Sequence, residues 1–290
     1  MHISICVKEI LDFLQIQPGQ KGLDATLGYG GHTKEMLKCL QGQGHLYALD
    51  VDPIESVKTK ERLEKAGYGE EILTIRQMNF ADIDQIAREA GPFDFVLADL
   101  GVSSMQIDNP ERGFTYKKEG PLDLRLNPQK GVSAAERLKE VTEEELAGML
   151  WENSDEPYAE EIAVTVMEKL RKGEPVETTI QLQKAIEEAL SFLPEREQKE
   201  AVKKSCQRTF QALRIDVNSE FEVLYAFMEK LPAALAPGGR VAILTFHSGE
   251  DRIVKKAFKE LKRAGVYSEI AQDVIRLSGG VYKEQPRSFY

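Results

Sequence analysis

Apolar residues in the first hundred positions of the chain gather into short runs separated by amphipathic stretches. The runs have the length and β-branched content of buried strands, and the stretches place apolar residues at helical spacing. The strand-like runs are 22–27, 45–51, 72–78 and 93–100. The helix-like stretches are 5–14, 33–40 and 54–66. Near-continuous apolar strands between helices are typical of a parallel sheet covered on both faces, so we predict an α/β fold.

The pattern changes after about residue 105. Residues 110–130 are rich in proline, glycine and charge and are predicted to form a loop. Residues 133–204 have helical periodicity throughout. The predicted breaks between these helices are Pro157, 173–175 and Pro194. Two segments, Ser133–Glu136 and Thr142–Glu145, have the spacing of a capping box and so predict helix starts.

The alternation resumes after this helical stretch. Its elements are a helix at 218–235, a turn at 237–239 and a strand at 240–246. We therefore predict a discontinuous α/β domain, 1–112 and 206–290, interrupted by an all-helical insertion domain at 113–205. An insertion of roughly 90 residues has the size of a small domain.

The composition narrows the class of protein. A chain of 290 residues with 42% hydrophobic content can bury a sizeable core. Apolar runs such as 241–246 are far too short to span a bilayer, and charges in the opening segment disfavour a signal peptide. Cys6, Cys39 and Cys206 are too widely spaced for a disulfide framework or a CxxC metal site. We expect a cytoplasmic protein without a membrane partner or a metal.

The formal net charge of −10 disfavours a general nucleic-acid binder, which carries a basic surface. A protein of this charge that acts on RNA must gather its positive charge locally. The candidate clusters are Lys117, Lys118 and Arg125; Lys199, Lys203, Lys204 and Arg208; and Lys255, Lys256, Lys259, Lys262 and Arg263. The last cluster recurs at three- and four-residue steps and lies largely on one helical face. Each cluster is also consistent with an ordinary solvated helix face.

The first candidate binding segment along the chain is the glycine-rich segment Asp24–Thr33, which follows a predicted strand and opens a predicted helix. Nucleotide-like ligands bind at such places in α/β sheets. Glycines let the backbone approach a ligand, and free amides at the helix start favour an anion. That anion is either the pyrophosphate of a dinucleotide or the carboxylate of S-adenosylmethionine. The order Gly28-x-Gly30-x-x-Thr33 nearly fits the nicotinamide fingerprint, so both cofactors stay open here.

Two carboxylates stand at the end of the second predicted strand. Asp50 can accept hydrogen bonds from both ribose hydroxyls of a nucleoside cofactor, each worth about 1.5–3 kcal/mol. Asp52 is expected to cap the helix that Pro53 opens. Because nicotinamide enzymes use the same carboxylate, Asp50 does not separate the two cofactors.

The fourth predicted strand ends at Asp99 in a turn of small residues. One acceptor of a methyl group from S-adenosylmethionine is the exocyclic amine of cytosine. This amine is a poor nucleophile, because its lone pair is delocalised into the ring. An acceptor for its N–H helps the amine to rehybridise as a methyl group moves in line from sulfur. We predict that Asp99 and the adjacent carbonyls provide that acceptor. The alternative is that Asp99 caps a turn or contacts the cofactor's amino group.

Five strings of the sequence resemble the RsmH (MraW) family. They are DATLGYGGHT, DVDP, DLGVSSMQIDNPERGFTYKKEGPLDLRL, TFQALRIDVNSE and PGGRVAILTFHSGEDRIVKK, in this order between about residues 22 and 260. The resemblance implies a class I, Rossmann-like methyltransferase sheet with a helical insertion. It also implies transfer of a methyl group from S-adenosylmethionine to the N4 amine of a cytosine in small-subunit ribosomal RNA.

The resemblance also implies the site residues. The cofactor would lie against Gly30, Gly31, His32, Asp50, Phe80, Asp99 and Gln106, and catalytic roles would fall to Asp99, His247 and Ser248. A ring at Phe80 can pack on adenine, or it can belong to the core. His247 can serve the target base, or it can fix a loop. Phe114, Tyr116 and Phe246 can stack a flipped cytosine, with core packing as the alternative.

The sequence departs from the family pattern at three places. Asn153–Glu161 replaces a more basic run, Lys204–Arg208 replaces a histidine-led run, and the chain ends at Pro286–Tyr290 without a basic strand. Three alternatives therefore stay open besides small-subunit RNA: another RNA such as tRNA, a non-catalytic ribosome-binding protein with the same fold, and a nicotinamide dehydrogenase. The sequence leaves monomer and homodimer equally open.

Overall fold

The computed structural model describes residues 4–271 together with Ser288 and Phe289, and the chain divides into two compact units. The sheet unit consists of Met1–Gly101 and Phe221–Tyr290, and the helical unit is Val102–Glu220. Of the predicted closing segment 286–290, only Ser288 and Phe289 fall within the described residues.

The sheet unit is built on one sheet with the strand order β3-β2-β1-β4-β5-β6. The strands are β1 Lys21–Asp24, β2 His45–Asp50, β3 Leu73–Gln77, β4 Phe93–Asp99, β5 Leu235–Thr245 and β6 Ser288–Phe289. The first five strands pair in parallel, and β6 pairs antiparallel with the end of β5. The order reverses between β1 and β4, which is where open α/β sheets bind their ligands.

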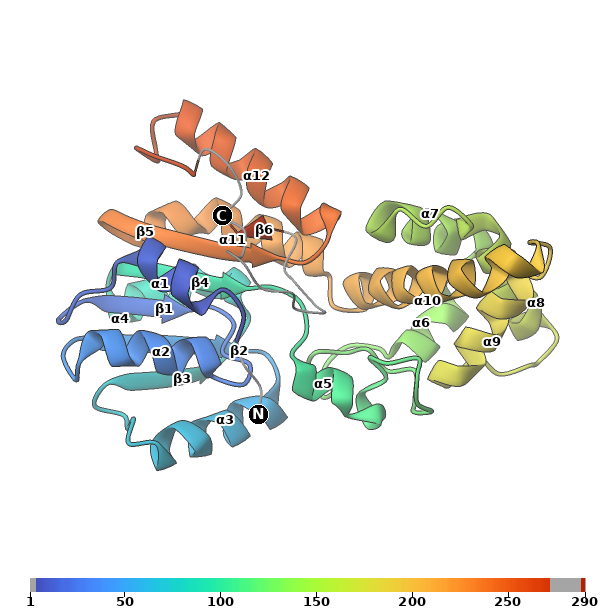
Figure 1. Cartoon of the computed structure of the whole chain (residues 1–290), viewed down its shortest axis with the longest axis horizontal. Coiled ribbons are helices and arrows are strands. Elements are labelled where there is room, and N and C mark those ends of the chain that lie inside the picture. The colour runs from blue at the N-terminus through green and yellow to red at the C-terminus, as the bar shows by residue number, and fades with distance from the viewer. Residues whose placement is uncertain (1–3, 272–287, 290) are drawn as a thin grey trace. The chain divides into compact units, whose positions relative to one another are not determined.

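Helices cover both faces of this sheet, as Figure 1 shows. They are α1 Val7–Leu14, α2 Gly31–Leu40, α3 Pro53–Lys65, α4 Ile83–Ala90, α11 Glu220–Ala234 and α12 Ser248–Arg263. One hydrophobic core joins the sheet to α1, α2 and α3, and the other joins it to α4, α11 and α12. The predicted α/β fold is confirmed.

Strand β4 explains why both faces need covering. Phe95 and Leu97 belong to the core under α1–α3, whereas Val96 and Ala98 belong to the opposite core. All four side chains are fully buried. Because successive side chains of a strand point to opposite faces, an uninterrupted apolar run must be buried on both sides.

The predicted turn at 237–239 is part of a strand in the structure. In the pairing of β4 with β5, Phe93 lies opposite Leu235 but Phe95 lies opposite Arg240. The register therefore shifts between these two pairs. Gly238 has φ +78°, so the turn survives as an irregularity inside β5.

The helical unit has a core of its own. Its helices are α5 Ser104–Asp108, α6 Ala134–Glu140, α7 Glu143–Ser154, α8 Ala159–Arg171, α9 Thr179–Ala189 and α10 Glu195–Val217. The predicted capping boxes at Ser133 and Thr142 are both present, and the predicted breaks fall between helices. Two further capping boxes start at Ser103 and Thr178.

The bounds of this unit differ from the predicted 113–205. The predicted end would cut α10, whose later residues Phe210 and Leu213 pack in the core of the helical unit. At the other end, Leu122 and Leu124 in the expected loop belong to the same core. The sequence pattern marks where helices begin, but it does not tell which core receives their apolar faces.

Within the described ranges, the structure contains no helix that combines the length and the apolar character needed to cross a bilayer.

Glycine substitutions at two positions should change stability in opposite directions. Gly22 lies opposite Phe95 in the sheet, and a Cβ at residue 22 would overlap the Phe95 ring. We expect Gly22→Ala to lower the free energy of unfolding by about 1–3 kcal/mol. Gly148 is inside α7 with open space around it, so Gly148→Ala should raise that free energy by up to about 1 kcal/mol. Urea denaturation measures both; equal effects would contradict the packing argument.

Candidate functional site

The candidate side chains of the sheet unit gather where β1, β2 and β4 end. These three strands are neighbours and run parallel, so their carboxyl ends lie at the same edge of the sheet. The glycine turn 28–31 follows β1, Asp50 ends β2 and Asp99 ends β4. Topology therefore brings together three segments that are far apart in the sequence.

The glycine turn leaves a backbone cradle at the start of α2. Gly28 and Gly30 have φ angles of +47° and +80°, in the left-handed region that favours glycine. Gly30 is the N-cap of α2 and provides no side chain to cap its amides. The first amides of a helix favour an anion, so this end of α2 can receive a carboxylate.

Asp24 holds the first turn of α2 in place through hydrogen bonds. Its carboxylate is fully buried and accepts hydrogen bonds from Thr33 Oγ1 at 2.6 Å and from the Thr26 amide at 3.1 Å. Burial raises the pKa of Asp24, against the effect of the Thr33 hydroxyl. Asp24 is thus a structural anchor of the turn.

Asp50 ties the glycine turn to the end of β2. One carboxylate oxygen accepts a hydrogen bond from the Gly28 amide at 2.9 Å, and the other accepts one from the Asp52 amide at 2.8 Å. Burial raises the pKa of Asp50 to about 6, although both amides favour the ionised form. Each oxygen keeps a second lone pair for a ligand hydroxyl.

Asp52 has the separate role predicted for it. Its side chain is fully buried and caps α3, accepting hydrogen bonds from the amides of Ile54 at 2.9 Å and Glu55 at 3.2 Å. Pro53 occupies the first turn, where it costs no helix hydrogen bond.

His32 and Asp99 face each other across the same edge. His32 Nε2 lies 3.4 Å from Asp99 Oδ2, and the imidazole is buried. Burial lowers the pKa of His32, but the carboxylates of Asp99, Asp24 and Glu35 outweigh it and leave the pKa raised. The Asp99 amide donates to Thr26 Oγ1 at 2.6 Å, which fixes the strand end.

Two buried polar atoms in this pair lack a hydrogen-bond partner among the described residues. They are His32 Nε2 and Asp99 Oδ1. A buried acceptor without a partner is costly, and such atoms often await a ligand. The unsatisfied carboxylate oxygen of Asp99 is suited to a cation or an N–H donor.

His247 and Ser248 begin α12 after β5. His247 is buried and caps the helix: its Nδ1 accepts from the Glu250 amide at 3.5 Å. Its Nε2 lies 3.2 Å from Glu250 Oε1, and its ring contacts the ring of Phe221 with centroids 5.8 Å apart. These contacts fit the alternative that His247 fixes a loop, while the catalytic role of His247 and Ser248 stays a prediction.

Phe80 follows β3 rather than ending it. It opens a 3₁₀ turn, Phe80–Asp82, and its ring meets Phe227 edge to face with centroids 5.2 Å apart. Phe80 is only partly buried, so part of its surface remains exposed, and its role in packing on adenine stays a prediction.

Gln106 belongs to the helical unit. It is buried in α5 and closes the capping box with Ser103. Phe114 and Tyr116 pack against the core of the same unit, and Tyr116 contacts Phe210 with ring centroids 5.7 Å apart. The cofactor role of Gln106 and the stacking role of the two rings stay predictions.

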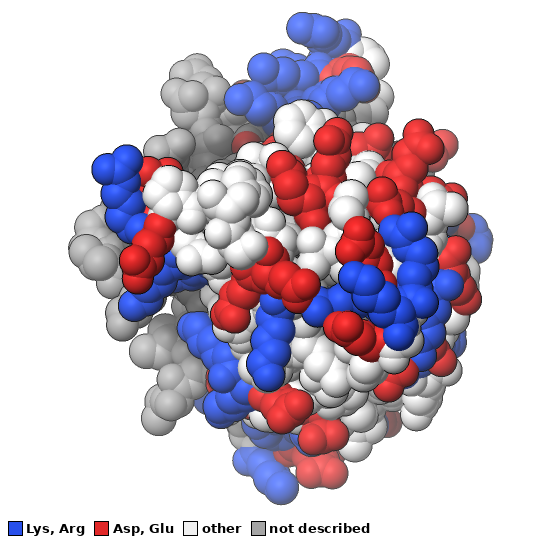
Figure 2. Space-filling model, turned by 90° about the vertical axis from the view of Figure 1, so that its right-hand side faces the viewer, with Lys and Arg blue, Asp and Glu red and all other residues white. Residues whose placement is uncertain are grey.

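The three basic clusters differ in how their charges are compensated. Arg125 pairs with Asp123 at 2.7 Å, and Lys204 pairs with Glu200 at 3.6 Å. Elsewhere in the helical unit, basic and acidic side chains are interspersed, as Figure 2 shows for one face. In the part of the chain that the structure describes, no ion pair joins Lys255, Lys256 or Lys259 to a carboxylate.

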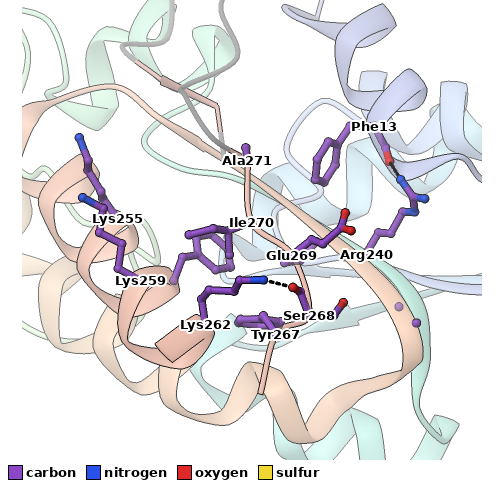
Figure 3. Close-up of a pocket in the computed structure, with 14 residues that line it drawn as sticks. Phe13, Arg240, Lys255, Lys259, Lys262, Tyr267, Ser268, Glu269, Ile270 and Ala271 are labelled. Carbon is purple, nitrogen blue, oxygen red and sulfur yellow. Dashed lines mark hydrogen bonds between the residues drawn. The ribbon is translucent and has the colours of Figure 1, made fainter. Parts of the chain in front are cut away.

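Three of the four lysines of α12 border one groove, and these three share the helical face that their spacing predicts. Lys255, Lys259 and Lys262 border a groove of about 910 Å³ together with Arg240, which extends from β5 (Figure 3). Lys262 donates to the Ser268 carbonyl, and Arg240 donates to the Phe13 carbonyl at 2.9 Å. Glu269 brings one negative charge to the same groove.

Sequence reasoning missed the residues that hold the site together. Thr26 supports the Asp99 amide, and Thr59 on α3 donates to the Gly28 carbonyl at 2.6 Å. Ser4 packs so closely on Gly31 that the helix start has no room for a side chain there. No sequence signal marks Thr59, because its burial and its contact with the glycine turn appear only in the fold.

A family model described as the MraW methylase family matches residues 1–275. The chain belongs to the MraW methylase family. The match of this MraW methylase spans the helical unit as well as most of the sheet unit. Family membership excludes the nicotinamide dehydrogenase that the glycine pattern alone left open.

Named relatives of this MraW methylase are similar over nearly its whole length. "Ribosomal RNA small subunit methyltransferase H 1" of Lachnoclostridium phytofermentans is 69% identical, covering 99% of this chain and 79% of that protein. The protein of the same name from Agathobacter rectalis is 68% identical, covering 96% and 80%. "Ribosomal RNA small subunit methyltransferase H 2" of Alkaliphilus metalliredigens is 66% identical, with the same coverage.

The raised pKa of Asp50 can be measured directly. Because burial outweighs the two amide hydrogen bonds, we expect the carboxyl carbon of Asp50 to titrate with a pKa of about 6 in carbon-detected NMR. The loss of that signal in Asp50→Asn assigns it. A titration near the ordinary aspartate value of about 3.9 would show that the site is well hydrated.

Proposed function

We propose that this MraW methylase transfers a methyl group from S-adenosylmethionine to the N4 amine of a cytosine in small-subunit ribosomal RNA. The observation that carries the proposal is Asp99, whose buried Oδ1 has no hydrogen-bond partner among the described residues. It lies at the strand edge that also holds the glycine turn and Asp50. Relatives up to 69% identical are named small-subunit ribosomal RNA methyltransferases, which supports the RNA.

The residues of the sheet unit fit the cofactor. The free amides at the start of α2 suit its carboxylate, and Asp50 suits the two ribose hydroxyls. Phe80 is only partly buried and can contact the adenine. When bound, S-adenosylmethionine supplies an electrophilic methyl group on a sulfonium. Each of these donors and acceptors therefore has a counterpart in the cofactor.

Asp99 and His32 provide the acid–base chemistry that the reaction needs. A cytosine amine that gains a methyl group must give up one N–H proton. Asp99 can accept that N–H and hold the amine in line with the methyl group. Because the pKa of His32 is raised, the imidazole keeps its proton over a wider pH range and places a positive charge 3.4 Å from Asp99 Oδ2.

The RNA partner is supported by charge. RNA affinity comes mainly from cations that neutralise phosphates, and this chain carries a net charge of −10. The lysines of α12 are cations without carboxylate partners among the described residues, so their charge is available to phosphates. Another RNA substrate and a non-catalytic ribosome-binding role predict different results in the following test.

Removal of the Asp99 carboxylate should abolish methyl transfer. We expect Asp99→Ala to reduce kcat by about 100-fold or more, because the amine loses its acceptor. The assay incubates small ribosomal subunits, or tRNA, with labelled S-adenosylmethionine and identifies the methylated nucleoside by mass spectrometry. Co-sedimentation with ribosomes is measured on the same samples. Asp12→Ala, which removes an exposed carboxylate paired with Lys8 on α1, is the matched control.

Three outcomes of this assay contradict the proposal. Full activity of Asp99→Ala would refute the role of the carboxylate. Methylcytidine in tRNA but not in small-subunit RNA would change the substrate. Stable association of the wild-type protein with ribosomes without any methyl incorporation would favour the non-catalytic role.

Charge reversal on α12 should weaken RNA binding. We expect Lys255→Glu with Lys259→Glu to lower RNA affinity about tenfold or more and to reduce the slope of log K against log salt by about two. Lys139→Glu with Lys172→Glu makes the same charge change at lysines already paired with glutamates. If both double variants behave alike, net charge rather than α12 determines binding.

A further inference from the structure

The glycine turn is held from the side of α3 by a buried hydroxyl. Thr59 is fully buried, and its Oγ1 donates to the Gly28 carbonyl at 2.6 Å. The Gly28 amide is bound to Asp50, so both polar backbone groups of Gly28 are fixed. The backbone conformation at Gly28 determines the direction of the amides that follow it.

Arg62 extends this contact into a chain of hydrogen bonds. Its Nη2 donates to Thr59 Oγ1 at 2.5 Å and lies 3.4 Å from the Tyr29 carbonyl oxygen. The guanidinium also stacks over the Tyr29 ring, with Cζ 4.1 Å from the ring centroid. A planar guanidinium suits this combination of stacking and directed donors better than an ammonium group. Arg62 therefore contacts Tyr29 by both ring and backbone.

Close packing restricts the turn as well. A Cβ at Gly30 would come within 2.7 Å of Thr59 Cγ2 and 3.2 Å of Leu63 Cδ1. The helix thus lies directly against the backbone of the turn. The Thr59 hydroxyl binds the Gly28 carbonyl, and the Thr59 methyl packs against Gly30. One side chain therefore restricts both glycines.

The same helix is attached to Asp50. Asp52 caps α3, and the Asp52 amide donates to Asp50 at 2.8 Å. The proposed ribose acceptor and the proposed carboxylate cradle are therefore both joined to α3, one at the start of the helix and one at Thr59. A displacement of α3 would change the spacing between the two.

We propose that Thr59 and Arg62 are positioning residues that preorganise the Gly28–Gly30 turn for the cofactor. The inference rests on the proposed function for the identity of that cofactor. Neither residue is needed for the transfer of the methyl group itself. Their contribution is to fix the turn that leads into α2, so that the first amides of α2 are in the binding conformation before the ligand arrives.

The test compares two substitutions of Thr59. Thr59→Val keeps the shape and removes the hydroxyl, and we expect it to raise the Kd for S-adenosylmethionine about tenfold by calorimetry. The kcat at saturating cofactor should stay within about twofold of wild type. Thr59→Ser restores the hydroxyl and should restore most of the affinity. Thr165→Val, which removes an exposed hydroxyl bonded to the Glu161 carbonyl on α8, is the matched control.

Arg62 gives a second and independent variant. Arg62→Met removes the donors and the charge, and it should weaken cofactor binding about as much as Thr59→Val. Arg62→Lys keeps only the charge and should not rescue binding, because it lacks the planar fork. Arg88→Met, at an exposed arginine paired with Asp84 on α4, is the matched control.

The outcomes separate this inference from the proposed function. If the wild-type protein does not bind S-adenosylmethionine, both are overturned. If the wild type binds and Thr59→Val and Arg62→Met bind equally well, only the inference is overturned. Urea denaturation of the same variants identifies a purely structural role: a loss of stability with unchanged Kd would also refute the inference.

Discussion

The two backbone amides that bind Asp50 are the interaction on which the site depends. The donors come from Gly28, in the turn after β1, and from Asp52, at the start of the helix after β2. One buried carboxylate therefore joins two βα connections that the sheet alone would only place side by side. The cost of burying it is visible in its raised pKa. This carboxylate is nonetheless held by directed hydrogen bonds on both oxygens.

The rest of the sheet unit supplies the rigidity that this arrangement needs. Strand β4 is buried on both faces, and its end is fixed by the hydrogen bond from the Asp99 amide to Thr26. Apolar packing has no direction, so it positions the strands without orienting the polar groups at their ends. Orientation comes from a few buried polar contacts, among them Asp24 with Thr33 and His32 with Asp99.

Features that depend on neighbours in the chain could be predicted from the sequence. The glycine turn, the cap at Asp52 and the capping boxes at Ser133 and Thr142 are all local. Topology then placed Asp50 and Asp99 at one edge, because carboxyl ends of parallel strands coincide. Contacts across the fold could not be read in this way. Nothing local distinguishes Thr59 or Arg62 from other polar residues on α3, and the irregularity in β5 depends on its pairing with β4.

The helical unit has its own hydrophobic core and is continuous in sequence between Val102 and Glu220, so the sheet unit is interrupted only once. A module with this construction can accumulate substitutions without disturbing the strands on either side of it. Natural variation should therefore be tolerated more readily in residues 127–208 than in the turns around Gly28 and Asp50.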